Sequence, residues 1–234
     1  MTEEETRIER DAIAFVKSHR KEIIEKFAHP DACRPVNKPV SLFMAGSPGA
    51  GKTEVSKGFM RRFKDMPIRI DADDIRMLCD GYTGANAHLF QSAANKGVNI
   101  LYDYALEKNL NCILDGTFAY GNAPENISRS LSRSRLVEIW FVFQDPVKAW
   151  EFTKVREVTE SRHVSRDVFI RSFKGARENV VAVKEQFGKA VELNVLIKDY
   201  EDGTEDVHLN VSSVELDRLT RGRYSVEELD TVLI

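Results

Sequence analysis

A glycine-rich segment early in the chain fits the pattern G-x-x-x-x-G-K-[ST], in which a backbone loop surrounds phosphate groups. Its eight residues are Gly46, Ser47, Pro48, Gly49, Ala50, Gly51, Lys52 and Thr53. The glycines let the backbone curl so that successive N–H groups point at an anion, and the next helix presents its positive end to the same anion. In such a loop the lysine reaches the β- and γ-phosphates and the threonine hydroxyl binds Mg²⁺. The segment therefore predicts nucleotide and Mg²⁺ binding.

The alternative is a glycine-rich turn that binds nothing, and the flanking sequence argues against it. An apolar run at residues 40–45 precedes the loop and predicts a buried strand. After the loop, apolar residues follow a helical period at Val55, Phe59, Met60 and Phe63. A strand before the loop and a helix after it are the context that the phosphate-binding motif requires.

An acidic segment follows a second expected strand, at residues 67–71, and contains Asp71, Asp73 and Asp74. A kinase that phosphorylates a hydroxyl benefits from a carboxylate that orients this nucleophile and accepts its proton. Strand alternation predicts that Asp71 and Asp73 share a side, with Asp74 capping a helix that starts near Ile75. We predict that Asp73 is the catalytic base; the alternative is that all three are helix caps and solvated charges.

A third expected strand, at residues 111–117, ends in Asp115 and Thr117. An apolar run leading to a carboxylate is typical of an acid that holds Mg²⁺ or its waters. Asp115 could instead form a hydrogen bond with a substrate. Thr117 could donate a hydrogen bond to substrate or phosphate, or it could be a plain turn residue.

Residues 147–189 are expected to be mostly helical and are rich in arginine. Arginine forms bidentate contacts with phosphate, so these side chains could neutralise a phosphoryl group during its transfer. We expect at least one of Arg156 and Arg162 to do so. The alternative is a solvated helix face, and we expect the neighbouring His163 to be structural.

Short apolar strands alternate with helical stretches along the chain, which predicts an α/β fold with a parallel central sheet flanked by helices. The fourth strand is expected at residues 137–143, and the acidic and glycine-rich segments all fall at the carboxyl ends of strands, where ligands collect. Residues 6–27 predict an amphipathic helix, followed by a proline-containing linker. Residues 194–198 and 206–211 predict a hairpin turning at Asp202 and Gly203, and Ser225 with Glu228 predicts a capping box.

These elements divide the chain into three parts. Residues 1–39 hold the N-terminal helix and linker, residues 40–193 the kinase core with its arginine-rich helical region, and residues 194–234 the hairpin and a short helix of the same domain. With 234 residues, 42% of them hydrophobic and 30% charged, the chain suits one globular domain.

Composition also bears on partners and location. The net charge of −3 gives no overall attraction to nucleic acid, so we expect no nucleic-acid partner. No apolar stretch is long enough to cross a membrane and no signal peptide precedes the acidic start, so we expect a cytoplasmic protein. The three cysteines lack C-x-x-C spacing, and we expect reduced thiols and no zinc site.

Four motifs together resemble the zeta toxin kinases over about residues 40–180. They are residues 46–53, residues 70–76, residues 113–117, and Arg156 with Arg162, His163 and Val164. The resemblance implies a P-loop kinase that transfers phosphate from ATP to the 3′ hydroxyl of the sugar in UDP-N-acetylglucosamine. It implies that Lys52 and Thr53 are the phosphate-loop residues, Asp73 the base, Thr117 a substrate-binding residue, and Arg156 and Arg162 the phosphate-binding arginines.

On the substrate side we place Asp71, Arg76, Asn99, Asp115 and Thr117, and here the sequence departs from the family pattern. A family glutamate that contacts the sugar nucleotide falls near Asn99, a family arginine falls at Ala119, and the strand-end glutamate is the shorter Asp115. Other acceptors therefore stay open: another nucleotide sugar, an antibiotic hydroxyl or a nucleic-acid 5′ end. A non-catalytic module gated by nucleotide is the alternative of a different class.

The resemblance also implies a partner, because a small helical antitoxin blocks the nucleotide site in zeta systems. Residues 6–27 could act as such an inhibitory helix within the chain. The favoured interpretation is that this helix packs its apolar stripe on the domain, as amphipathic helices ordinarily do.

Overall fold

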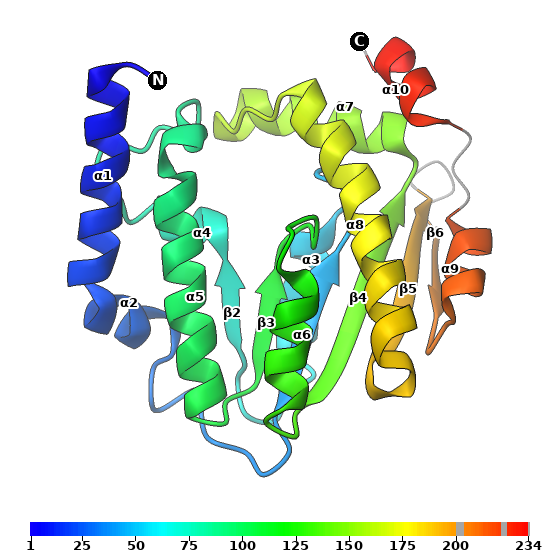
Figure 1. Ribbon diagram of the computed structural model, residues 1–234, viewed down its shortest axis with the longest axis horizontal. Coiled ribbons are helices and arrows are strands. Elements are labelled where there is room, and N and C mark those ends of the chain that lie inside the picture. The colour runs from blue at the N-terminus through cyan, green and yellow to red at the C-terminus, as the bar shows by residue number, and fades with distance from the viewer. Residues whose placement is uncertain (200–203, 221–223, 234) are drawn as a thin grey trace.

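The computed structural model describes residues 1–199, 204–220 and 224–233. Its centre is a six-stranded sheet in the order β2-β3-β1-β4-β5-β6 (Figure 1). The strands are β1 Val40–Ala45, β2 Ile68–Asp71, β3 Cys112–Asp115, β4 Leu136–Gln144, β5 Glu192–Asp199 and β6 Thr204–His208. The first five strands pair in parallel, as the sequence predicts.

Strand β6 runs antiparallel to β5 at one edge of the sheet. The predicted hairpin therefore exists, but β5 also pairs in parallel with β4, so the hairpin is part of the central sheet. The predicted turn residues Asp202 and Gly203 lie outside the described residues. The capping box of Ser225 and Glu228 is present at the start of α10, Val226–Val232.

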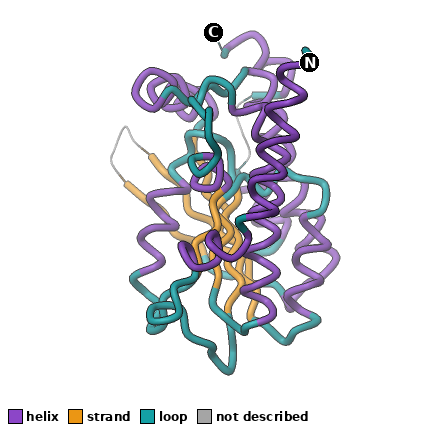
Figure 2. The backbone as a smooth tube through the Cα atoms, turned by 90° about the vertical axis from the view of Figure 1, so that its left-hand side faces the viewer, coloured by secondary structure: helices purple, strands orange, loops and turns teal. Residues whose placement is uncertain are grey.

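The sheet is covered on both faces, which explains why its strands are apolar runs rather than alternating sequences. In β1, Phe43 and Ala45 join the larger core cluster, whereas Leu42 and Met44 join a second cluster. Helix α3, Lys52–Met60, contributes Phe59 to this second cluster, where its ring lies 4.5 Å from that of Trp140. Figure 2 shows the strands between helices on either side.

The larger core lies under helices α5, Gln91–Glu107, α6, Ala123–Leu131, and α8, Arg166–Phe187 (Figure 1). The short helix α4, Ala72–Arg76, follows β2 directly and packs on α5. Helix α7, Pro146–Glu160, follows β4, while α9, Ser213–Leu219, lies beside β6. Two 3₁₀ turns, η1 Ala87–Phe90 and η2 Gly188–Ala190, precede α5 and β5.

The N-terminal segment forms two helices, α1 Glu3–Ser18 and α2 Arg20–Phe27, where the sequence predicted one. The break falls at His19, whose backbone leaves the helical region at φ −98° and ψ 24° while its N–H still bonds the Phe15 carbonyl oxygen at 2.9 Å. Both helices pack on α5 and bury Ala12, Val16 and Ile23. The apolar stripe is therefore used in packing.

None of the helices in the described ranges is long and apolar enough to span a membrane.

Candidate active site

The phosphate-binding loop connects β1 to α3, and its shape depends on glycine. Gly46 has φ +133°, and a Cβ there would lie 2.3 Å from the Val142 carbonyl oxygen. Gly49 has φ +74°, and a Cβ would lie 2.0 Å from the Ala149 carbonyl oxygen. Gly51 is left-handed at φ +86° and caps α3. A larger side chain at Gly46 or Gly49 would push the loop off the neighbouring elements.

Lys52 is buried at the start of α3, and its ammonium group donates to the carbonyl oxygen of Ser47 at 2.6 Å. Burial lowers its pKa to about 8, against the opposing charge of Asp115, and the charges of Arg162 and Arg156 lower it further. The positive charges of Lys52, Arg156 and Arg162 repel one another, and a bound phosphate would offset this repulsion. The cluster is therefore suited to binding a polyanion.

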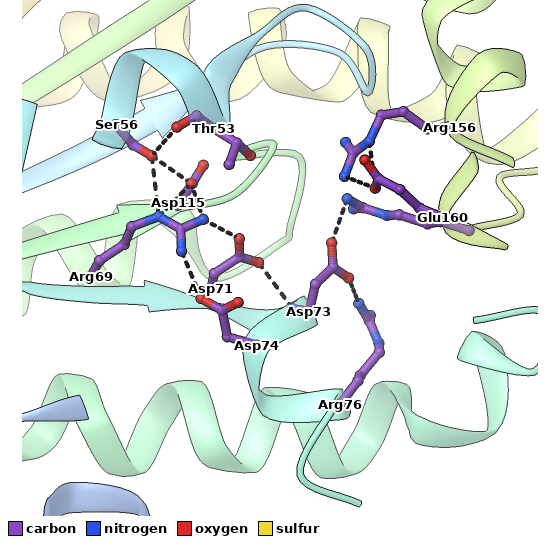
Figure 3. Close-up of polar contacts among 11 residues, drawn as sticks. Thr53, Ser56, Arg69, Asp71, Asp73, Asp74, Arg76, Asp115, Arg156 and Glu160 are labelled. Atoms are coloured by element: carbon purple, nitrogen blue, oxygen red, sulfur yellow. Dashed lines mark hydrogen bonds and ion pairs between the residues drawn. The ribbon is translucent and has the colours of Figure 1, made fainter. Parts of the chain in front are cut away.

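An arginine that the sequence analysis did not select lies at the centre of the acidic strand ends. The guanidinium of Arg69 donates to Asp115 at 2.7 and 3.0 Å and pairs with Asp71 at 2.5 Å and Asp74 at 2.6 Å (Figure 3). Ser56 of α3 also donates to Asp115, at 2.6 Å. A lone arginine in the short apolar strand β2, two residues before Asp71 and so on the same strand face, is the signal that could have identified it.

Helix α4 begins one residue after Asp71, and this changes the predicted roles of the acidic segment. Asp71 is the residue that caps the helix, accepting a hydrogen bond from the Asp73 backbone N–H at 2.9 Å. Asp74 pairs with Arg69, so the prediction that Asp74 caps the helix was wrong. The strand alternation that predicted a shared side for Asp71 and Asp73 ends at Asp71, and the two carboxylates have different arginine partners.

Burial raises the pKa of Asp71 to about 6, with the charges of Asp115 and Asp73 acting in the same direction. Arg69 opposes this shift, since it favours the ionised carboxylate.

Asp73 lies between two arginines that come from different elements. One carboxylate oxygen accepts a hydrogen bond from Arg76 of α4, and the other pairs with Arg162 at 2.5 Å. Arg76 in turn donates to Gln91 of α5 at 2.5 Å. Arg162 belongs to the segment 161–165 between α7 and α8, so this contact joins the arginine-rich region to the strand ends.

Arg156 does not reach Asp73. Its guanidinium bonds Glu160, one turn later on α7, at 2.8 and 2.9 Å. It still lies close enough to the loop to lower the pKa of Lys52, after the larger effects of burial, Asp115 and Arg162. His163 bonds Glu157 at 2.6 Å, the kind of contact that the structural interpretation predicts.

A cavity of about 840 Å³ opens at the carboxyl ends of β2 and β3. Its described lining includes eight of the predicted site residues: Pro48, Asp71, Asp73, Arg76, Asn99, Asp115, Thr117 and Arg162. It meets the phosphate-binding loop at Pro48, while Lys52, Thr53 and Arg156 are not part of its wall. No lining residue comes from residues 1–43, so α1 and α2 do not enter the cavity.

Thr117 serves the phosphate-binding loop as well as the cavity. Its carbonyl oxygen accepts a hydrogen bond from the Gly46 N–H at 3.1 Å, and its hydroxyl accepts one from the Ala119 N–H at 3.3 Å. The residue is thus a turn residue whose side chain also faces the cavity.

A mostly parallel sheet, a phosphate-binding loop before α3 and acidic residues at the neighbouring strand ends define a P-loop kinase fold. The family model described as Zeta toxin matches residues 25–212. This chain belongs to the zeta toxin family, whose members are P-loop kinases.

The fold is shared with at least two solved structures. A structure of the PezAT chromosomal toxin–antitoxin system of Streptococcus pneumoniae has a chain that is 15% identical to this one in sequence, with a TM-score of 0.65. The match covers 100% of this chain and 93% of that chain. A second structure is AvrRxo1-ORF1:-ORF2 with ATP, which is 14% identical with a TM-score of 0.62, covering 94% of this chain and 73% of that one. The comparison with curated proteins found no match.

Proposed function

We propose that this chain transfers the γ-phosphate of ATP to a sugar hydroxyl of an acceptor bound in the cavity. The observation that supports it most is the position of Asp73: it lines a cavity that meets the phosphate-binding loop at Pro48, and Arg162 links it to the arginine-rich segment. Membership of a kinase family supports the same reaction.

In the proposed reaction, the backbone N–H groups of the loop and Lys52 hold the ATP phosphates. The acceptor hydroxyl oxygen forms a bond to the γ-phosphorus, the bond from that phosphorus to the β–γ bridging oxygen breaks, and ADP leaves. The hydroxyl proton passes to Asp73. Because both oxygens of Asp73 are bonded, Arg162 must release one of them, and the γ-phosphate is the anion that would attract it.

Thr53 and Asp115 differ in how well they fit Mg²⁺. The Thr53 hydroxyl forms no hydrogen bond within the described residues and suits a direct ligand. One Asp115 oxygen already accepts bonds from Ser56 and Arg69, so we propose that Asp115 holds a water of the ion. The described residues contain no cluster of three or more His, Cys, Asp or Glu side chains placed to bind a metal, which suits an ion that binds mainly to ATP. Bound Mg²⁺ would neutralise charge on the phosphates.

Two acceptors follow from different observations. The family resemblance supports the 3′ hydroxyl of UDP-N-acetylglucosamine, which is the reference acceptor. An observation of the cavity favours a second one, an uncharged sugar: Arg76 and Arg162, the two arginines in the described lining, are both bound to Asp73, which leaves no unpaired cation for a diphosphate.

A small antitoxin is the proposed protein partner, since the PezAT neighbour is a toxin–antitoxin system. A cytoplasmic location stays a prediction.

The test is acceptor-dependent release of ADP from purified protein, with the product identified by mass spectrometry. We expect Asp73→Asn to keep ATP binding and to lower the transfer rate by about 10²–10⁴-fold, and Lys52→Ala to cost more. Asp80→Asn, which changes an exposed aspartate outside the cavity, is the matched control. An unchanged rate in Asp73→Asn would show that Asp73 is not the base, and ATP binding without turnover on any acceptor would favour the non-catalytic module.

A further inference from the structure

One wall of the cavity is built from carboxamide side chains. Three of them, Gln91, Asn95 and Asn99, are spaced four residues apart on α5 and therefore share a face of that helix. Two more, Asn122 and Asn126, lie at the start of α6 with the same spacing. We call these five residues the carboxamide wall. Each offers hydrogen-bond donors and acceptors without carrying a charge.

Contacts within the described residues use part of this capacity, since the buried Asn126 accepts a hydrogen bond from Arg129 at 3.0 Å. Gln91 accepts from Arg76 and donates to the Asn95 side-chain oxygen at 2.8 Å, so the wall begins at the arginine that holds Asp73. The Asn95 amide nitrogen and the whole side chain of Asn99 form no further hydrogen bond there. Asn99 is exposed to the cavity rather than packed under other residues.

The charged residues of the cavity adjoin the carboxamide wall at Arg76, which donates to Gln91. Asp71, Asp73 and Asp115 stand at the strand ends, and Arg76 and Arg162 are both bound to Asp73. A phosphorylated acceptor would bring negative charge toward this carboxylate-rich end and find its cations occupied, which is costly in a partly buried site. Sugar hydroxyls, which donate and accept, match the unused amide nitrogen of Asn95 and the unused side chain of Asn99 instead.

We infer that the acceptor is an uncharged sugar, held by the carboxamide wall with one hydroxyl directed at Asp73. This inference rests on the proposed kinase activity and chooses between its two acceptors. The transfer is the one given above: the sugar oxygen bonds the γ-phosphorus, its proton passes to Asp73, and ADP leaves.

The first experiment compares N-acetylglucosamine and glucose with N-acetylglucosamine 1-phosphate and UDP-N-acetylglucosamine, using Mg²⁺-ATP and the full chain. We expect kcat/KM to be about ten-fold or more higher for one of the uncharged sugars. Calorimetry with a non-hydrolysable ATP analogue measures acceptor binding without transfer. Preference for either phosphorylated compound, or absence of binding by both uncharged sugars, overturns the inference. Sugar binding without any ADP release would support the inference and refute the kinase proposal.

The second experiment removes carboxamides from the wall. Asn95→Leu and Asn99→Leu should each raise the KM for the preferred sugar by about ten-fold, with the KM for ATP unchanged, because each loses hydrogen bonds to the acceptor. Asn99→Leu is the cleaner test, since Asn95→Leu also removes the bond from Gln91. Lys96→Ala is the matched control, since Lys96 is an exposed residue of the same helix outside the cavity. If both leucine variants keep the wild-type KM for the sugar, the wall does not bind the acceptor.

Discussion

At the scale of single residues, the site contains two groups of ion pairs, one around Arg69 and one around Asp73. Arg69 joins Asp71, Asp74 and Asp115, and through Asp115 and Ser56 it links the acidic strand ends to the helix of the phosphate-binding loop. Arg76 and Arg162 surround Asp73 instead. Arg69 therefore stabilises the framework, while the contacts of Asp73 are the ones that must change during the proposed reaction.

The raised pKa of Asp71 predicts an acid limit to activity. As pH falls through about 6, this carboxylate takes up a proton and loses its ion pair with Arg69, which loosens the cap that fixes Asp73. We expect kcat to fall below about pH 6 for this reason. In Asp71→Asn the amide oxygen can still cap the helix but does not titrate, so the fall near pH 6 should disappear. The measurement is a kcat against pH profile, with Asp80→Asn as the control that keeps it; an unchanged profile in Asp71→Asn would assign the limit to another group.

The residues that the sequence identified belong to short motifs whose spacing is set within one loop or one strand end. Eight of them line one cavity, because the carboxyl ends of neighbouring parallel strands meet at one edge. Arg69 was missed, and the pairing of Asp73 with Arg76 and Arg162 was not predicted, since such contacts depend on which elements become neighbours in three dimensions. The resulting roles of the site residues stay predictions until variants are measured.

At the scale of elements, the loop between β1 and α3 depends on contacts with β4 and α7. Gly49 has φ +74°, and a Cβ there would lie 2.0 Å from the Ala149 carbonyl oxygen and 2.8 Å from the Thr153 hydroxyl. We expect Gly49→Ala to weaken ATP binding by about ten-fold or more, because the loop must shift and alanine is strained at this φ. Gly58 lies at an exposed position of α3, and a methyl group added there would meet no other atom. We expect Gly58→Ala to stabilise the fold by up to about 1 kcal/mol. Calorimetry of ATP binding and thermal unfolding measure both effects, and equal ATP affinity in the two variants would contradict the prediction.

Strands were the elements best predicted from sequence, because β1, β3 and β4 are buried on both faces and form apolar runs. The short helices α6 and α9 were not predicted, and neither was the break at His19, because it is a local change of backbone dihedrals that leaves the apolar period of residues 6–27 intact. The direction of β6 was correctly implied by the hairpin, whereas its place in the central sheet required knowing that β5 pairs with β4.

At the scale of the whole molecule, the N-terminal helices lie on the outside of α5, away from the phosphate-binding loop (Figure 1). If α1 and α2 are structural, a substitution at one of their buried residues should lower the stability of the protein and leave kcat/KM for ATP unchanged. Ile23 of α2 is 2% exposed, and we expect Ile23→Ala to lower the free energy of unfolding by about 2–5 kcal/mol through lost burial and the cavity left behind.

Chemical denaturation measures this loss, and steady-state kinetics at a temperature where both proteins are folded measure the activity. Lys21→Ala, at a side chain that is 89% exposed, is the control and should change stability by less than about 0.5 kcal/mol. An inhibitory helix within the chain predicts the opposite pattern, since loosening α2 would release the site and raise kcat/KM for ATP. Because α1 and α2 contribute nothing to the described cavity wall, we expect kcat/KM for ATP to stay unchanged. Inhibition would then require a separate chain that reaches the loop side of the molecule.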